Sequence, residues 1–146
     1  MFIDNNYFRN TFALLLIFLL PACNSGSSTL DIHEPWIRTP APNAQALAGY
    51  MLIENNTDAP VTLLQAKAEG FNHVMIHQSI NENGTHKMEH AGNLVIPANS
   101  AVRFQHGSYH IMFMGINRDI KPGDQIPVTL IFDNTREKDV SFLVKD

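Results

Sequence analysis

The chain has 146 residues and a formal net charge of −4 at pH 7, and this length fits a single domain. Its mild acidity argues against a nucleic-acid partner, because nucleic-acid-binding proteins usually present a basic patch. The sequence contains seven histidines and six methionines but only one cysteine, Cys23. All the histidines lie between His33 and His110, so metal-binding side chains are concentrated in the middle of the chain.

An apolar run at residues 12–20 is the first pattern along the chain. It is too short to cross a bilayer, which needs about 20 apolar residues, and it has the length expected within a signal peptide. The run ends in Leu20-Pro21-Ala22-Cys23, which resembles the bacterial lipobox, whose cysteine is lipidated and becomes the first mature residue. The alternative is an ordinary signal peptide with an incidental cysteine. Both interpretations predict export, and the lipobox predicts a lipid anchor at the periplasmic face of a bacterial membrane, inner or outer.

The chain is therefore predicted to have three parts. Residues 1–22 form a lipoprotein signal peptide, and residues 23–29 comprise the lipidated Cys23 and a flexible tether of small polar residues. Residues 30–146 form one folded domain, which is expected to begin near Leu30.

This domain consists of short strand-like segments separated by turn signals. No long segment has the period of a helix, so an all-β sandwich or barrel is expected. Pro127 has no backbone N–H, which predicts an edge strand or a bulge at its position. Asn83-Gly84 is a strong tight-turn signal between two strand-like runs. The predicted strands span residues 47–53, 61–66, 74–80, 109–115, 125–132 and 140–144, and further turns lie at residues 55–60, 97–100 and 121–124.

The strand predicted at residues 109–115 has two chemically different faces. Alternate side chains of a strand share a face. One face has a tyrosine, an isoleucine and a phenylalanine, which suit a core. The other face has His110, Met112 and Met114. It therefore combines one imidazole with two thioethers.

Two other segments pair histidine with methionine in the same way. Met75 and His77 share a face of the strand at residues 74–80, and a third stretch places His86, Met88 and His90 on one face. Methionine is more often core filler, and a histidine on a strand is more often a surface or core residue than a ligand. Three such segments are difficult to explain by packing alone. The remaining members are expected to be structural, namely Met51 in the core and His33, His73 and His106 elsewhere.

A site that mixes imidazole and thioether favours copper in its monovalent state. Thioether sulfur is a soft ligand that selects Cu(I), and imidazole suits copper as well as zinc. Such a site adds no negative charge, which favours a monovalent ion over a divalent one. Zinc would instead recruit Cys, His or carboxylate ligands.

Four of these residues fit the spacing of a known motif. His77, Met88, His110 and Met112 match H-x10-M-x21-H-x-M, the signature of the periplasmic copper chaperones called PCu(A)C. The resemblance covers roughly residues 32–144. It includes a segment that looks like the family's opening strand, Glu34 to Arg38, and a stretch close to the family's most typical segment, Gly107 to Gly115. Four residues at fixed spacings make this signal far more specific than a single short motif.

The resemblance implies a cupredoxin-like or immunoglobulin-like β-sandwich that binds Cu(I) through these four residues at one exposed end. It also implies a metallochaperone, not an enzyme, that delivers copper toward the CuA centre of cytochrome c oxidase, often alongside a Sco-type thiol protein. Strand parity places Met75 and Met114 beside the ligand positions, where they would either support the ligands or act as reserve ligands. A water molecule, His86 or His90 would complete the coordination shell.

Other functions fit the sequence less well. Blue-copper electron transfer needs a cysteine thiolate, and Cys23 belongs to the leader or is lipidated. A zinc hydrolase needs three ligands, an open position and a base, and no recognised spacing links Glu82 or Glu89 to the histidines. A non-metal structural lipoprotein would leave the His/Met faces unexplained. Copper storage or resistance would use the same site as delivery, and it remains an alternative.

Overall fold

The computed structural model describes residues 29–146, which form ten strands. The predicted signal peptide, Cys23 and most of the tether lie outside the described residues. In the part of the chain described, no helix is long and apolar enough to cross a membrane. The strands are β1 (Leu30–Arg38), β2 (Ala46–Asn55), β3 (Val61–Lys67), β4 (Phe71–Glu82), β5 (Thr85–His90), β6 (Leu94–Ile96), β7 (Ser100–Phe104), β8 (Tyr109–Ile116), β9 (Gln125–Phe132) and β10 (Glu137–Lys145).

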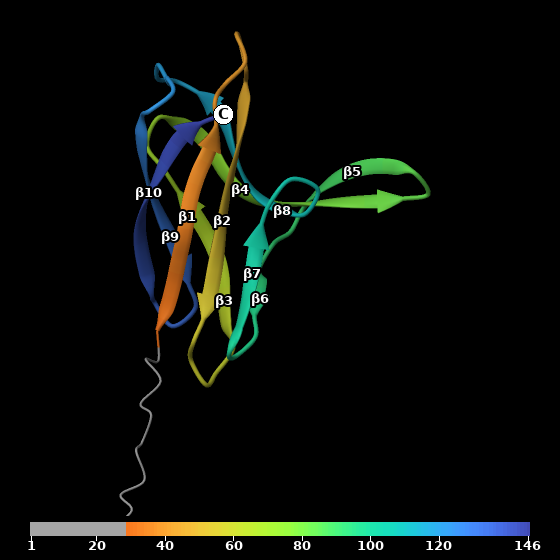
Figure 1. Cartoon of the computed structure of the whole chain (residues 1–146), viewed down its shortest axis with the longest axis vertical. Coiled ribbons are helices and arrows are strands. Elements are labelled where there is room, and N and C mark those ends of the chain that lie inside the picture. Colours follow the sequence, from red (N-terminus) through yellow and green to blue (C-terminus); the bar gives the residue numbers. More distant parts are fainter. Residues whose placement is uncertain (1–28) are drawn as a thin grey trace, which may run out of the picture.

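Hydrogen bonds join all ten strands in one order, β5-β4-β8-β7-β2-β1-β10-β9-β3-β6, with a further pairing of β8 to β2. This sheet folds over on itself, because β3 and β4 contact each other although they lie near opposite ends of the order. Figure 1 shows the strands packed into an elongated body, from which the β4–β5 hairpin extends to one side. The all-β sandwich predicted from the sequence is confirmed.

Alternate residues of the strands fill one core inside the folded sheet. Ile111 and Phe113 of β8 are fully buried. The Phe113 ring centroid lies 5.0 Å from that of Phe71 on β4 and 6.0 Å from that of Phe142 on β10. Strand β2 approaches so closely that a β-carbon on Gly49 would lie 2.7 Å from the Phe113 ring. This packing determines which face of β8 points into the core. The opposite face of β8 has His110, Met112 and Met114.

Two features of the strands differ from the prediction. The short strands β6 and β7, which flank the turn predicted at residues 97–100, were not predicted. Strand β9 lies between β10 and β3, so the edge expected from Pro127 is wrong for the strand as a whole. The physical requirement is still met, because Pro127 pairs with Ser141 of β10 while the pairing with β3 begins only at Thr129.

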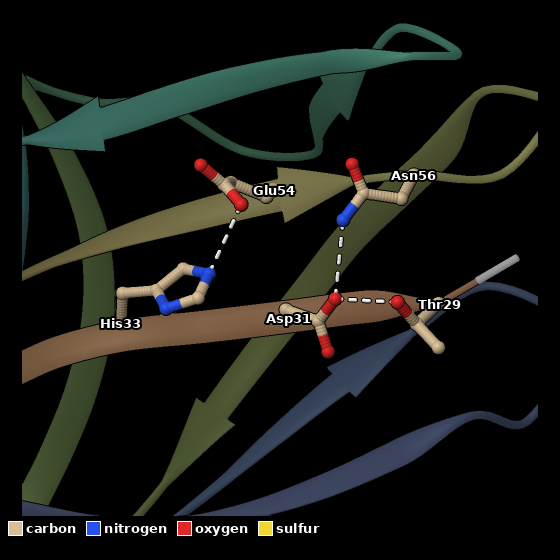
Figure 2. A network of polar contacts seen from close by, with 5 residues as sticks. All are labelled: Thr29, Asp31, His33, Glu54 and Asn56. Carbon is tan, nitrogen blue, oxygen red and sulfur yellow. Dashed lines mark hydrogen bonds and ion pairs between the residues drawn. The ribbon is translucent and has the colours of Figure 1, made fainter. Parts of the chain in front are cut away.

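A polar network lies at the start of the domain, on β1 and the end of β2 (Figure 2). Asp31 accepts hydrogen bonds from the Thr29 hydroxyl and, at 3.1 Å, from the Asn56 side-chain amide. The Thr29 hydroxyl is the main cause that lowers the pKa of Asp31 below its ordinary value. His33 pairs with Glu54 at 3.1 Å in the same region.

Candidate metal-binding site

Strand pairing brings the His/Met segments onto one face of the sheet. His77 on β4 lies directly opposite His110 on β8 and, on its other side, opposite His90 on β5. Met75 lies opposite Met112 in the same way. Side chains directly opposite each other have β-carbons about 4.5–5.5 Å apart. The ring centroid of His77 is accordingly 6.0 Å from that of His110 and 6.1 Å from that of His90.

The β4–β5 hairpin brings Met88 to this face. Its turn residues Asn83 and Gly84 have positive φ angles of 51° and 83°, as the hairpin turns favoured by this dipeptide require. The resulting register places Met88 opposite Ser79, which shares a face with His77. Met88 is 65% exposed, and all of β5 is exposed. The thioether is therefore reachable from solvent.

His110 is only 3% exposed, and a backbone carbonyl orients its ring. Its Nδ1 lies 3.1 Å from the carbonyl oxygen of Ser108. A carbonyl oxygen only accepts, so Nδ1–H is the donor and the lone pair of the neutral ring is on Nε2. His110 Nε2 is buried without a hydrogen-bond partner. Buried polar atoms nearly always have a hydrogen-bond partner, so this atom is an exception. Its lone pair is free to bind a ligand.

His77 has the same property. Its Nδ1 is buried and has no hydrogen-bond partner. Burial is the main cause that lowers the pKa of His77 below the ordinary value of 6.5, and positive charge on His110 and His90 would lower it further. The lowered pKa favours the neutral imidazole, which is the form that binds metals.

A cavity of about 390 Å³ opens beside His110. Its wall includes Met88, His110 and Met112 as well as His86 and His106. His77 is not on this wall and faces His110 across the β4–β8 pairing. The structure thus places three motif residues around one cavity and the fourth directly opposite one of them, His110.

His106 is a further candidate that the sequence alone did not predict, because no partner for it could be identified there and it was expected to be structural. It lies in the turn between β7 and β8, where the Ser108 N–H donates to the Gln105 carbonyl at 3.1 Å. Gly107 has a φ of 78° there, and the chain turns back tightly enough to bring His106 to the cavity. The sequence did contain one signal for this placement. His106 and His110 are only four residues apart, and the glycine between them, Gly107, permits a tight turn.

The donor set at this site is two imidazoles with thioethers. Among residues 29–146, no three His, Cys, Asp or Glu side chains are grouped so that they could hold a metal ion. The motif residues instead combine two neutral rings with two neutral sulfurs, a set with the softness that suits Cu(I).

Two solved structures of copper-bound proteins have a similar fold. The solution structure of CuI-DR1885 from Deinococcus radiodurans is 26% identical, with a TM-score of 0.69 over 85% of each chain. The copper-bound PCuAC domain from PmoF2 is 24% identical, with a TM-score of 0.67 over 80% of this chain and 92% of that one. These matches define the class of protein as one with the PCuAC-type β-sandwich fold. They confirm the cupredoxin-like or immunoglobulin-like fold and the resemblance to PCu(A)C proteins.

The family follows from the sequence match. Residues 30–144 match the model of the family described as "Putative lipoprotein LpqE-like". An uncharacterized protein, RP573, of Rickettsia prowazekii (strain Madrid E) is 30% identical over 131 residues, which cover 86% of this chain and 70% of the relative. The chain belongs to the LpqE-like family.

Proposed function

We propose that this protein is an extracytoplasmic copper chaperone that binds Cu(I) through His77, Met88, His110 and Met112. The observation that most supports this proposal is the directly opposed pair of His77 and His110, each with a buried ring nitrogen that has no partner. Two thioethers lie beside this pair. The copper-bound states of the similar structures support the same cargo.

The ligand chemistry favours Cu(I) over divalent ions. Both imidazoles are neutral ligands, and the lowered pKa of His77 keeps its ring deprotonated at a lower pH than an ordinary histidine. Soft thioethers from Met88 and Met112 add affinity for Cu(I) without adding charge. A divalent ion would retain its full charge in this neutral environment.

Release of copper depends on the contrast between the ligands. His110 is buried and oriented by the Ser108 carbonyl, so it remains in place. Met88 is exposed on a hairpin that extends from the body of the protein (Figure 1), so an incoming ligand reaches the ion from that side. A cysteine or histidine of the acceptor would displace the Met88 thioether first and the histidines afterwards. Copper would pass through a complex in which the two proteins share it.

The first experiment is a Cu(I) competition titration against a chromophoric chelator. It uses protein that starts just after Cys23, since all ten strands lie beyond that residue. The comparison is with the double variant His110→Ala/Met112→Ala, and His33→Ala is the control because His33 lies on β1 with its own partner. One tight equivalent that is lost in the double variant and kept in His33→Ala supports the proposal. Weak binding that is the same in all three proteins contradicts it.

The acceptor is proposed to be the CuA subunit of cytochrome c oxidase, a Sco-type thiol protein, or a related assembly partner. A soft, exposed thioether ligand suits transfer to the thiolates of either protein. Copper-loaded protein is mixed with the apo CuA domain or the apo Sco-type protein, the two proteins are separated, and the copper content of each is measured. Rapid transfer that needs contact between the proteins supports delivery. Retention of copper in the presence of either acceptor would favour storage or resistance.

The mature protein is proposed to be held at the periplasmic face of a membrane by lipid on Cys23. The lipobox-like segment and the family description support this arrangement. Wild type and Cys23→Ala are compared by fractionation of cells that export both. Wild type is expected in the membrane fraction, and Cys23→Ala, if it is exported, is expected to be released on disruption. Equal release of both would contradict a lipid anchor.

A further inference from the structure

The face that contains the motif residues continues past them along β4 and β8. Strand pairing there places three consecutive pairs of soft or borderline donors directly opposite each other. Within such a ladder, diagonal neighbours lie about 7–8 Å apart, within reach of long side chains. Moving away from the hairpin, the three pairs are His77 with His110, Met75 with Met112, and His73 with Met114.

The outer two pairs lie on the exterior of the protein rather than in its core. Ile76 and Ile111 occupy alternate positions in the same strands and are buried on the opposite face. Met75 and Met114 are half-buried, and His73 is exposed. Core packing, the usual reason for methionine in a strand, therefore does not explain these two thioethers.

The neighbouring strand leaves room over this part of the face. On β2, Ala48 lies opposite Met112 and Ala46 lies opposite Met114. Both side chains are small, so β2 does not cover the thioether of Met114. On the other side, His73 and Met75, but not Met114, line a cavity of about 570 Å³ between β3 and β4. This cavity is distinct from the one that contains Met88 and Met112.

We propose that His73, Met75 and Met114 form a second site for a soft monovalent metal ion of the Cu(I) class. His73 and Met114 are directly opposite each other, and Met75 is two residues from His73 on the same face. One imidazole and two thioethers are neutral, soft or borderline ligands, which suit Cu(I) and not Mg²⁺ or Ca²⁺. The inference goes beyond the proposed function, since it uses none of the four motif residues.

The position of Met75 gives the second site a role. Met75 lies opposite Met112, so its sulfur is adjacent to a ligand of the first site. An ion that exchanges Met112 for Met75 would move along the face without returning to solvent. The second site would therefore hold a second ion or receive copper before it reaches His77 and His110.

The test uses the full chain in mild detergent with Ag(I), a soft monovalent cation that does not change oxidation state. Native mass spectrometry counts bound ions, and NMR of ¹³C-labelled methionine methyl groups reports on each site separately. Wild type is expected to bind two ions, and the Met75 and Met114 methyl signals are expected to shift with one of them. The double variant Met75→Leu/Met114→Leu is expected to bind one. Met51→Leu is the control, because Met51 lies in the core. This control variant should bind two ions.

The separate methyl signals distinguish the two proposals. If only the Met88 and Met112 signals shift, or if Met75→Leu/Met114→Leu still binds two ions, the second site is wrong and the proposed function is unaffected. If the Met75 and Met114 signals shift while those of Met88 and Met112 do not, the second site stands and the proposed function is contradicted. Leucine keeps the size of the methionine side chain, and an unchanged amide spectrum confirms that the variant is folded.

Discussion

Two regions of this protein place histidine next to another titratable side chain, and they differ in what that partner is. On β1 and β2, the side chain of His33 is 47% exposed and lies 3.1 Å from a carboxylate oxygen of Glu54 (Figure 2). On β4 and β8, His77 faces His110 with no carboxylate between them, and a nitrogen of each ring is buried without a partner. A buried ring nitrogen without a partner gains most from a ligand, and His33 has no such nitrogen. The comparison shows that the environment of a histidine decides whether one of its ring nitrogens is left buried and free to bind a ligand.

The largest expected effect on copper binding comes from removing both imidazole rings of the site. The double variant His77→Ala/His110→Ala should weaken Cu(I) binding by more than about 100-fold. Removing a residue that only hydrogen-bonds to a metal ligand already weakens metal binding by roughly 10–100-fold, and this variant removes two ligands. The matched variant His33→Ala should leave the affinity unchanged. Chelator competition measures both. Equal losses in the two variants would remove the distinction between the regions.

The next largest effect separates the two faces of β8. Ile111→Ala should lower the free energy of unfolding by about 2–5 kcal/mol, because it leaves a hole in the core beside Phe113. Met112→Ala, on the opposite face, should cost only about 1 kcal/mol while it weakens Cu(I) binding. Urea denaturation and copper titration of both variants test this. Comparable stability losses would show that Met112 is a packing residue.

A smaller effect concerns pH. Burial, and then positive charge on His110 and His90, lowers the pKa of His77 below 6.5. The unfolded chain therefore binds more protons than the folded one below pH 6.5, so the free energy of unfolding should decrease as the pH falls from 6.5 through the folded pKa. Above pH 6.5 this contribution is complete and constant. NMR titration of the His77 ring in metal-free protein should give a midpoint below 6.5.

The cause of this shift is tested by His90→Gln, which removes one of the charges without touching His110. The His77 midpoint should rise in this variant but stay below 6.5, because burial is the main cause. A His77 midpoint at or above 6.5 in the wild-type protein would contradict the assigned environment.

The smallest effect is expected at the partnered histidine. The His33–Glu54 pair is exposed, and exposed ion pairs contribute about 0–1 kcal/mol. His33→Gln should therefore change the free energy of unfolding by less than about 1 kcal/mol and leave copper binding unchanged. Thermal unfolding with and without copper tests both. A large loss of stability would show that the network in Figure 2 matters more than its exposure indicates.

The local sequence pattern predicted much of this architecture. The features that it did not predict depend on short strands or on pairing between distant strands. Alternation on residues 109–115 correctly placed Ile111 and Phe113 in the core and His110 on the other face. Strand β6 is too short, at three residues, to show an alternating pattern. The interior position of β9 was missed because Pro127 forbids only a local hydrogen bond, and the second neighbour pairs further along the strand.

The sequence by itself determined the identities of the candidate ligands, their spacing and the parity that sets them apart from the core, because these depend only on residue type and strand geometry. Only the tertiary structure decided that His77 lies opposite His110, that the Ser108 carbonyl orients the His110 ring, and that His106 reaches the same cavity. Each of these depends on the register between strands or on the path of a turn. Register between strands far apart in the sequence, such as β4 and β8, is set by how their apolar faces pack in the whole sheet, and neither strand alone contains that information.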